Sequence, residues 1–120
     1  MSRDHRKLRV FLLADSLALE IYRGTNDFPS EERFGLTSQI RRAAVSAASN
    51  IVEGCARRST REYLHFLNVA AASAAEAQYL VDLSRRLGIV RQPAWQHLNA
   101  QYSELIAGLQ ALLNSLDGMP

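Results

Sequence analysis

One stretch, residues 34–62, constrains the fold more than any other part of the chain. On a helix it separates into stripes at three-to-four spacing. Two stripes are apolar and about 100° apart, and the third is polar. Small side chains on both apolar stripes predict close packing against two neighbours, one in the same bundle and one from a next subunit. The first stripe is Leu36, Ile40, Ala44, Ala47, Ile51 and Cys55; the second is Val45, Ala48, Val52 and Ala56; the polar one is Gln39, Arg42, Ser46, Ser49, Asn50, Glu53 and Arg57.

The rest of the chain shows the same helical periodicity. We predict helices over residues 7–23, 36–57, 60–87 and 93–116. Gly24 and Gly88 follow the first and third as helix stops, and a capping box from Ser59 to Glu62 begins the third. Four amphipathic helices with short connections predict an all-α, antiparallel up-down-up-down four-helix bundle. We expect one domain over residues 1–120, with 1–6 and 117–120 frayed.

Two further positions bear on packing. The third predicted helix has a centre of small residues, Ala70 to Ala75, which would let a facing backbone approach closely. Gly108 interrupts the leucine-rich fourth helix at a cost of about 1 kcal/mol relative to Ala. We therefore expect another backbone close to Gly108.

Composition excludes several classes of protein. No apolar run approaches the ~20 residues of a membrane span, and Asp15 and Glu20 interrupt the apolar part of the amino-terminal segment, which therefore does not resemble a signal peptide. Cys55 is the only cysteine, so no disulfide can form within the chain. These features predict a cytoplasmic protein with no membrane contact.

Catalytic and metal-binding patterns are weak. A Glu-x-x-His pair, typical of di-iron bundles, occurs once, at Glu62 and His65, whereas such sites need two pairs. No motif places a base beside Cys55 or a serine, and no glycine loop could cradle a phosphate. We therefore expect no catalytic residues, no metal and no cofactor, and the chain is not predicted to be an enzyme.

The polar stripe allows two interpretations. Its side chains could form a solvated face with weak pairs along the helix. Alternatively, they could form a structural network or a subunit contact, which the apolar flanks favour. In that case we expect Glu53 to pair with Arg42 or Arg57. The residues assigned to this network are Gln39, Arg42, Asn50, Glu53 and Glu76.

Arginines cluster at two predicted helix junctions. One cluster is Arg57, Arg58 and Arg61, with Arg41 beside the polar stripe; the other is Arg85 and Arg86, near Arg91. These six, Arg41, Arg57, Arg58, Arg61, Arg85 and Arg86, are candidate nucleic-acid contacts. If they were repeated in an oligomer, they would bind phosphates without dependence on the nucleotide sequence, and the affinity would fall as the salt concentration rises. In a monomer, such patches commonly only confer solubility, and the sequence shows no exposed aromatic platform.

The stretch also resembles a family, the bacterial four-helix proteins named for open reading frames in intervening sequences of 23S ribosomal RNA genes. The combination of GLTSQIRRA with NIVEG is its most specific part, and a run AASAAEA departs from the family's usual Gly-Ser pair near Ser73. The matching residues are Tyr22-Arg23, Phe28-Pro29, Glu32, Gly35 to Ser46, Asn50 to Gly54, Ser59, Glu62, Phe66-Leu67 and Glu76.

The resemblance implies a four-helix bundle that assembles as a homopentameric ring. Relatives include accessory proteins of diversity-generating retroelements, which are basic pentamers that bind a reverse transcriptase and nucleic acid. We therefore expect a non-enzymatic, homo-oligomeric adaptor that binds RNA or DNA backbone through arginines, with a possible protein partner. The alternative is a protein-interaction scaffold with no nucleic-acid role.

Overall fold

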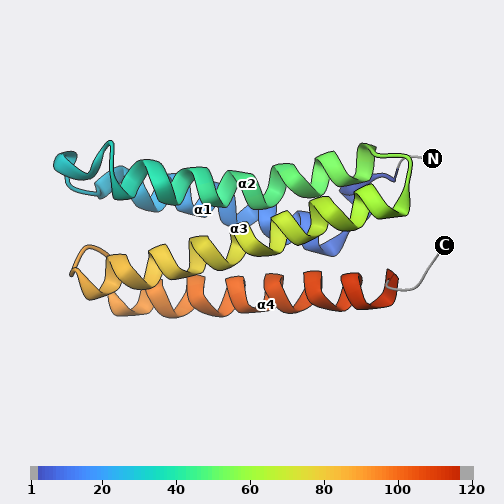
Figure 1. Ribbon diagram of the computed structural model, residues 1–120. Coiled ribbons are helices and arrows are strands. Elements are labelled where there is room, and N and C mark those ends of the chain that lie inside the picture. Colours follow the sequence, from blue (N-terminus) through green and yellow to red (C-terminus); the bar gives the residue numbers. More distant parts are fainter. Residues whose placement is uncertain (1–2, 117–120) are drawn as a thin grey trace.

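The computed structural model describes residues 3–116 and confirms the all-α prediction (Figure 1). Each of the four predicted helices is present, with bounds that differ from the expected ones by at most two residues. The long helices are α1 (Arg9–Gly24), α2 (Leu36–Ala56), α3 (Thr60–Arg86) and α4 (Gln92–Leu116). Three short 3-10 turns are η1 (His5–Lys7), η2 (Thr25–Asp27) and η3 (Ser30–Glu32).

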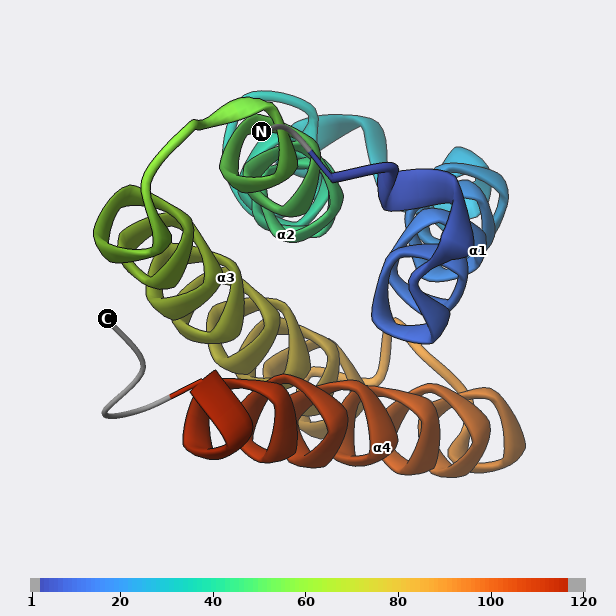
Figure 2. The same cartoon turned by 90° about the vertical axis from the view of Figure 1, so that its right-hand side faces the viewer.

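Consecutive helices run in opposite directions along an elongated molecule of 48 × 23 × 19 Å (Figure 1). Viewed from the end, they surround a common core in chain order, and α4 is visibly tilted relative to α2 (Figure 2). The start of α2 and the end of α3 therefore lie at one end of the bundle, and the α2–α3 connection lies at the other. No helix within residues 3–116 has the length and apolar character that crossing a bilayer requires.

The α2–α3 pair packs most extensively. Its contact surface is built from small residues that are at most 1% exposed: Ala43, Ala44, Ala47, Ala70, Ala74 and Ala77. Near the end of α2, a Cβ atom added to Gly54 would lie 3.0 Å from Cβ of Phe66 and 3.2 Å from Cδ1 of Tyr63. Small residues therefore let these two helices approach, as the small-residue centre of α3 predicts.

The two apolar stripes of α2 have different surroundings. Every residue of the first stripe, from Leu36 to Cys55, is buried in the core. In the second stripe only Ala48 is buried, while Val45 is 42% exposed and Ala56 is exposed. The chain thus covers one stripe itself and leaves most of the other open to solvent.

The two predicted glycine stops behave differently. Gly88 has φ +76°, the left-handed conformation that favours glycine, and Ile89 N–H reaches back to Ser84 O at 2.9 Å. Gly24 is the last residue of α1, with a right-handed φ of −69°. The buried Thr25 hydroxyl ends α1 instead, because Oγ1 donates to Ile21 O at 2.7 Å.

Two details differ from expectation. Residues 3–6 are ordered: Arg3 N–H donates to Cys55 O at 2.7 Å, and Asp4 caps η1 by accepting from Arg6 N–H. The predicted fraying at 1–2 and 117–120 falls outside the described residues. The neighbour of Gly108 is a side chain, since an added Cβ would lie 2.9 Å from Cγ1 of Val10.

Cys55 lies in the core at the end of α2 and is only 1% exposed. Burial raises the pKa of its thiol above the ordinary value, and the neighbouring Arg3 charge offsets this only in part. The thiol is therefore both inaccessible and protonated near neutral pH, which is the opposite of what a nucleophile needs.

Replacing Gly54 by Ala tests the close approach of α2 and α3. We expect a net loss of up to about 2 kcal/mol in the free energy of unfolding, because overpacking costs about 1–3 kcal/mol and the gain in helix propensity offsets only ~1 kcal/mol of it. Urea unfolding measures this change. Gly24→Ala is the control, since a Cβ there meets nothing within 4 Å, and it should be neutral or stabilising. Equal stability of the two variants would contradict the close approach.

Burial of Cys55 can be tested with a coloured thiol reagent at mildly alkaline pH. The folded protein should react slowly, because the thiol is buried and the raised pKa leaves little thiolate. The same protein in concentrated urea should react at the rate of a free cysteine. Rapid reaction in native buffer would show that Cys55 is accessible.

Candidate nucleic-acid interface

A ladder of polar contacts joins α2 to α3. Arg42 Nη2 lies 2.7 Å from Glu76 Oε2, and the hydroxyls of Ser46 and Ser73 lie 2.8 Å apart. On α2 itself, Asn50 Nδ2 donates to Ser46 O at 2.8 Å and to Ser46 Oγ at 3.0 Å. Three of the five predicted network residues, Arg42, Asn50 and Glu76, therefore lie along the contact between α2 and α3.

The other two network residues lie apart from the ladder. Gln39 is exposed, and Glu53 is exposed with only a long contact of 4.0 Å to Arg57 Nη2. The partner of Arg42 is Glu76 rather than Glu53, because α3 carries Glu76 across from Arg42. Ser73, where the sequence departs from the family pattern, is buried and joins Glu76 on the α3 side of the ladder.

Arg85 and Arg86 share one carboxylate. Arg85 Nη2 lies 2.7 Å from Asp82 Oδ1, and Arg86 Nε lies 3.0 Å from Asp82 Oδ2. The hydrogen bond from Arg85 is the main reason why the pKa of Asp82 is lowered. The Arg85 guanidinium also lies 4.3 Å from the centre of the Trp95 ring. Both cations are thus engaged within the chain, with half of their combined charge neutralised.

Arg41, which we expected beside the polar stripe, lies at the same end of the bundle as Arg85 and contacts the end of α1. Its Nε donates to Thr25 Oγ1 at 2.7 Å, and Nη2 donates to Tyr22 O at 3.3 Å. These contacts tie the start of α2 to the end of α1. Sequence spacing could not reveal them, since they depend on the path of the loop between the two helices.

Arg58 and Arg61 line an open hollow of about 650 Å³ at the start of α3. The Ser59 hydroxyl caps this helix by accepting from Glu62 N–H at 3.1 Å, as the capping box predicts. Among residues 3–116, no carboxylate lines the hollow; the lining residues are Arg58, Ser59, Thr60, Arg61, Leu64, His65 and Asn68. We call this surface the α3-start hollow.

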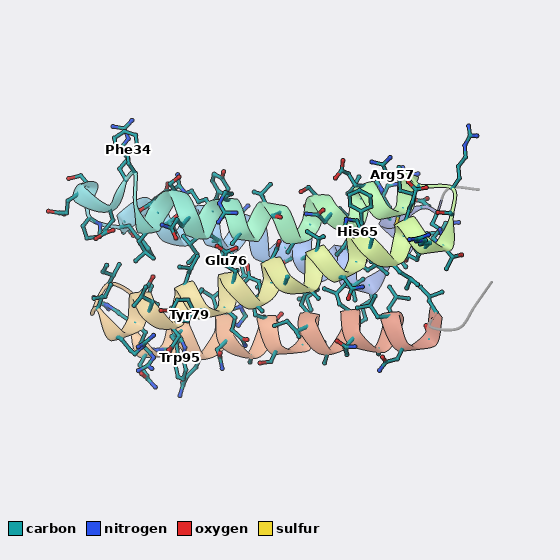
Figure 3. All side chains as sticks on the ribbon, in the orientation of Figure 1. Phe34, Arg57, His65, Glu76, Tyr79 and Trp95 are labelled. Carbon is teal, nitrogen blue, oxygen red and sulfur yellow. The ribbon has the colours of Figure 1, made fainter. Side chains whose placement is uncertain are left out.

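The electrostatics of the α3-start hollow favour an anion. The helix dipole places positive charge at this end. The Ser59 cap already accepts from Glu62 N–H, and the Glu62 carboxylate, which is not among the lining residues, lies 3.1 Å from Ser59 Oγ. Neither Arg58 nor Arg61 takes part in any of the ion pairs within residues 3–116. Arg57 stands beside them, with its guanidinium 4.8 Å from the Phe66 ring centre. Figure 3 shows Arg57 and His65 at this end of the molecule.

Metal binding has little support in the described part of the chain. No group of three or more His, Cys, Asp and Glu side chains within residues 3–116 could hold a metal ion. His97 instead pairs with Glu20, with Nε2 and Oε1 2.8 Å apart.

Some aromatic rings are exposed, although the sequence predicted no exposed aromatic platform. Phe34 is 89% exposed, and Tyr79 is 56% exposed, so exposed aromatic rings do exist. Phe34 projects from the α2-start end of the bundle (Figure 3). The signal was present in the sequence, because Phe34 stands between Arg33 and Gly35, before the helix and outside both apolar stripes.

Comparison with known proteins agrees with this architecture. A crystal structure from Bacteroides thetaiotaomicron, of a protein of unknown function from the S23 ribosomal protein family, superimposes with a TM-score of 0.81. The two chains share 23% identity, and the match covers 88% of this chain and 95% of the other. At that identity the likeness establishes the fold alone. No curated protein matches the sequence.

The family model for the 23S rRNA-intervening sequence protein matches residues 6–111. This range includes all of the α2 stretch and both ends of the bundle at which arginines gather. The chain therefore belongs to the 23S rRNA-intervening sequence protein family.

Proposed function

We propose that this protein is a non-enzymatic, homo-oligomeric adaptor of the cytoplasm that binds the phosphate backbone of RNA or DNA. The α3-start hollow carries the proposal. It combines a helix N-terminus with two arginines that take part in no ion pair within residues 3–116, and none of the described residues that line it is acidic. Phosphates bind well where arginine side chains and helix N-termini point at the same place.

The ion pairs favour some of the candidate arginines over others for this function. Arg85 and Arg86 are held by Asp82, so a phosphate would have to compete with that carboxylate. Arg58 and Arg61 take part in no ion pair within residues 3–116, so they could bind a phosphate without first losing a partner. We therefore assign the backbone contact to Arg58 and Arg61, with Arg57 in support, and remove Arg85 and Arg86 from the candidates.

The open second stripe of α2 supports self-association. Val45 is 42% exposed on a helix whose first apolar stripe is buried, and Val52 and Ala56 continue the same stripe as Val45. A second copy could cover this stripe, and the family resemblance favours five copies in a ring. Each α3-start hollow would then be repeated, so that a nucleic acid contacting several copies binds by avidity.

The second candidate is a protein-interaction scaffold with no nucleic-acid role. Leu12 and Leu19 favour it, because they are 55% and 50% exposed and lie two turns apart on one side of α1. A helix from a partner protein could pack there. Absence of nucleic-acid binding at low salt, together with binding to a partner protein, would favour this candidate.

Replacing Arg58 and Arg61 together by Ala tests the proposed binding of phosphates. We expect weaker binding to structured RNA, and a slope of log K against log salt that falls by about one for each phosphate the variant can no longer neutralise. Electrophoretic shifts at several salt concentrations measure both quantities.

The matched control replaces Arg85 and Arg86, which removes the same charge from the paired cluster. This control should bind almost as well as the natural protein, provided that both variants keep its oligomeric size. Equal weakening of binding in the two variants would contradict the assignment to the α3-start hollow.

Val45→Asp tests the location of the contact between subunits. A buried, unpaired carboxylate should dissociate the oligomer, which we expect to be about five times the 13.4 kDa of one chain. Light scattering after gel filtration measures the mass. Leu12→Asp places the same charge on exposed α1 and should leave the mass unchanged. A monomeric natural protein, or dissociation by Leu12→Asp alone, would contradict the proposal.

A further inference from the structure

A second basic surface lies at the opposite end of the bundle from the α3-start hollow. It is an open groove of about 440 Å³ close to the end of α1 and the start of α2. Tyr22, Phe34 and Arg41 form part of its walls. In the described part of the chain, three arginines and two aromatic rings line it and no carboxylate does; the residues are Tyr22, Arg33, Phe34, Thr37, Ser38, Arg41 and Arg42. We call it the aromatic groove.

The Phe34 ring is presented by an ordered turn. Gly35 N–H donates to Glu32 O at 3.1 Å, and the Glu32 carboxylate accepts from Leu36 N–H at 3.2 Å, which caps α2. The turn is therefore fixed on both sides of Phe34, although the ring itself is 89% exposed. An exposed apolar ring contributes no burial energy to folding. The exposed position of Phe34 leaves a flat π-face accessible to a ligand.

Arg41 supplies a fixed positive charge beside that ring. Its guanidinium is held by Thr25 Oγ1, Tyr22 O and Asn26 Oδ1, which are all neutral acceptors, and lies 4.6 Å from the Tyr22 ring centre. No ion pair within residues 3–116 involves Arg41 or Arg33. Arg33 lies 5.4 Å from the centre of the Phe34 ring. The groove thus holds uncompensated charge next to aromatic surface.

We propose that the aromatic groove binds an unpaired nucleotide of a single-stranded nucleic acid, with the base stacked on Phe34 and the adjoining phosphate on Arg41 and Arg33. Stacking platforms combined with cations are how proteins bind single strands without reading their sequence. The inference rests on the proposed affinity for nucleic acid, but it assigns a different site and adds stacking to charge.

The chemistry distinguishes this ligand from a duplex. A paired base is stacked between its neighbours and cannot offer its face to Phe34, whereas a base in a loop, bulge or end can. A free nucleotide presents the same combination of base and phosphate. Competition by a mononucleotide therefore has to be compared with binding of a strand.

The test measures fluorescence anisotropy of a labelled single-stranded oligouridine and of a duplex of equal length. Phe34→Leu removes the π-face but keeps an apolar side chain, and its exposed position should leave folding intact. We expect single-strand binding to weaken about fivefold or more, since stacking contributes about 1–3 kcal/mol per base, while duplex binding is unchanged. Uridine monophosphate is the competitor that identifies a free-nucleotide site.

Tyr79→Leu is the matched control, because it removes an exposed aromatic ring from α3. It should leave both affinities unchanged. An equal effect of Tyr79→Leu and Phe34→Leu, or no effect of Phe34→Leu, would overturn the inference while the proposed backbone binding stands. Complete absence of binding by the natural protein at low salt would overturn both.

Two more outcomes are decisive. If Arg58→Ala with Arg61→Ala abolishes duplex binding but keeps a single-strand affinity that depends on Phe34, the aromatic groove is supported as a separate site. If Phe34→Leu instead lowers the oligomer mass in light scattering, Phe34 is a contact between copies of the chain, and the inference is overturned.

Discussion

The close packing of α2 on α3 is the constraint on which the rest of the structure depends. Small side chains at the contact, together with Gly54 opposite Tyr63 and Phe66, let the two helices approach along most of their length. This approach brings Arg42 to Glu76 and Ser46 to Ser73. It also places the start of α3 directly after the end of α2, so that Arg57, Arg58 and Arg61 stand together at one end of the bundle.

Helix positions and the first apolar stripe could be predicted because both depend on local spacing. Residues from Leu36 to Cys55 at three-to-four intervals leave one way to bury them. The pairing of Asp82 with Arg85 and Arg86 could also have been found, since these residues lie three and four positions apart on one helix. The Arg42–Glu76 contact could not, because it spans 34 residues and depends on the register between α2 and α3.

Charge alone is a poor guide to function in this chain. Arginines gather at both ends, yet the structure separates them by what they contact. Arg85 and Arg86 are paired to a carboxylate, and Arg41 is held by neutral acceptors. Arg58 and Arg61 line a hollow to which no residue of 3–116 contributes a carboxylate. The free energy available for binding a phosphate differs accordingly, because a paired cation must first give up its partner. Among the arginines that have no carboxylate partner within residues 3–116, Arg58 and Arg61 lie on the α3-start hollow, and Arg33 and Arg41 lie on the aromatic groove.

Arginine footprinting with phenylglyoxal and mass spectrometry tests this central claim most directly, because it reports each guanidinium separately in the natural protein. We expect Arg58 and Arg61 to react faster than Arg85, which Asp82 and Trp95 hold with its side chain 31% exposed. Addition of single-stranded RNA at low salt should protect Arg58 and Arg61 and leave the rates of Arg85 and Arg86 unchanged. Protection of Arg85 and Arg86 with no change at Arg58 and Arg61 would contradict the account.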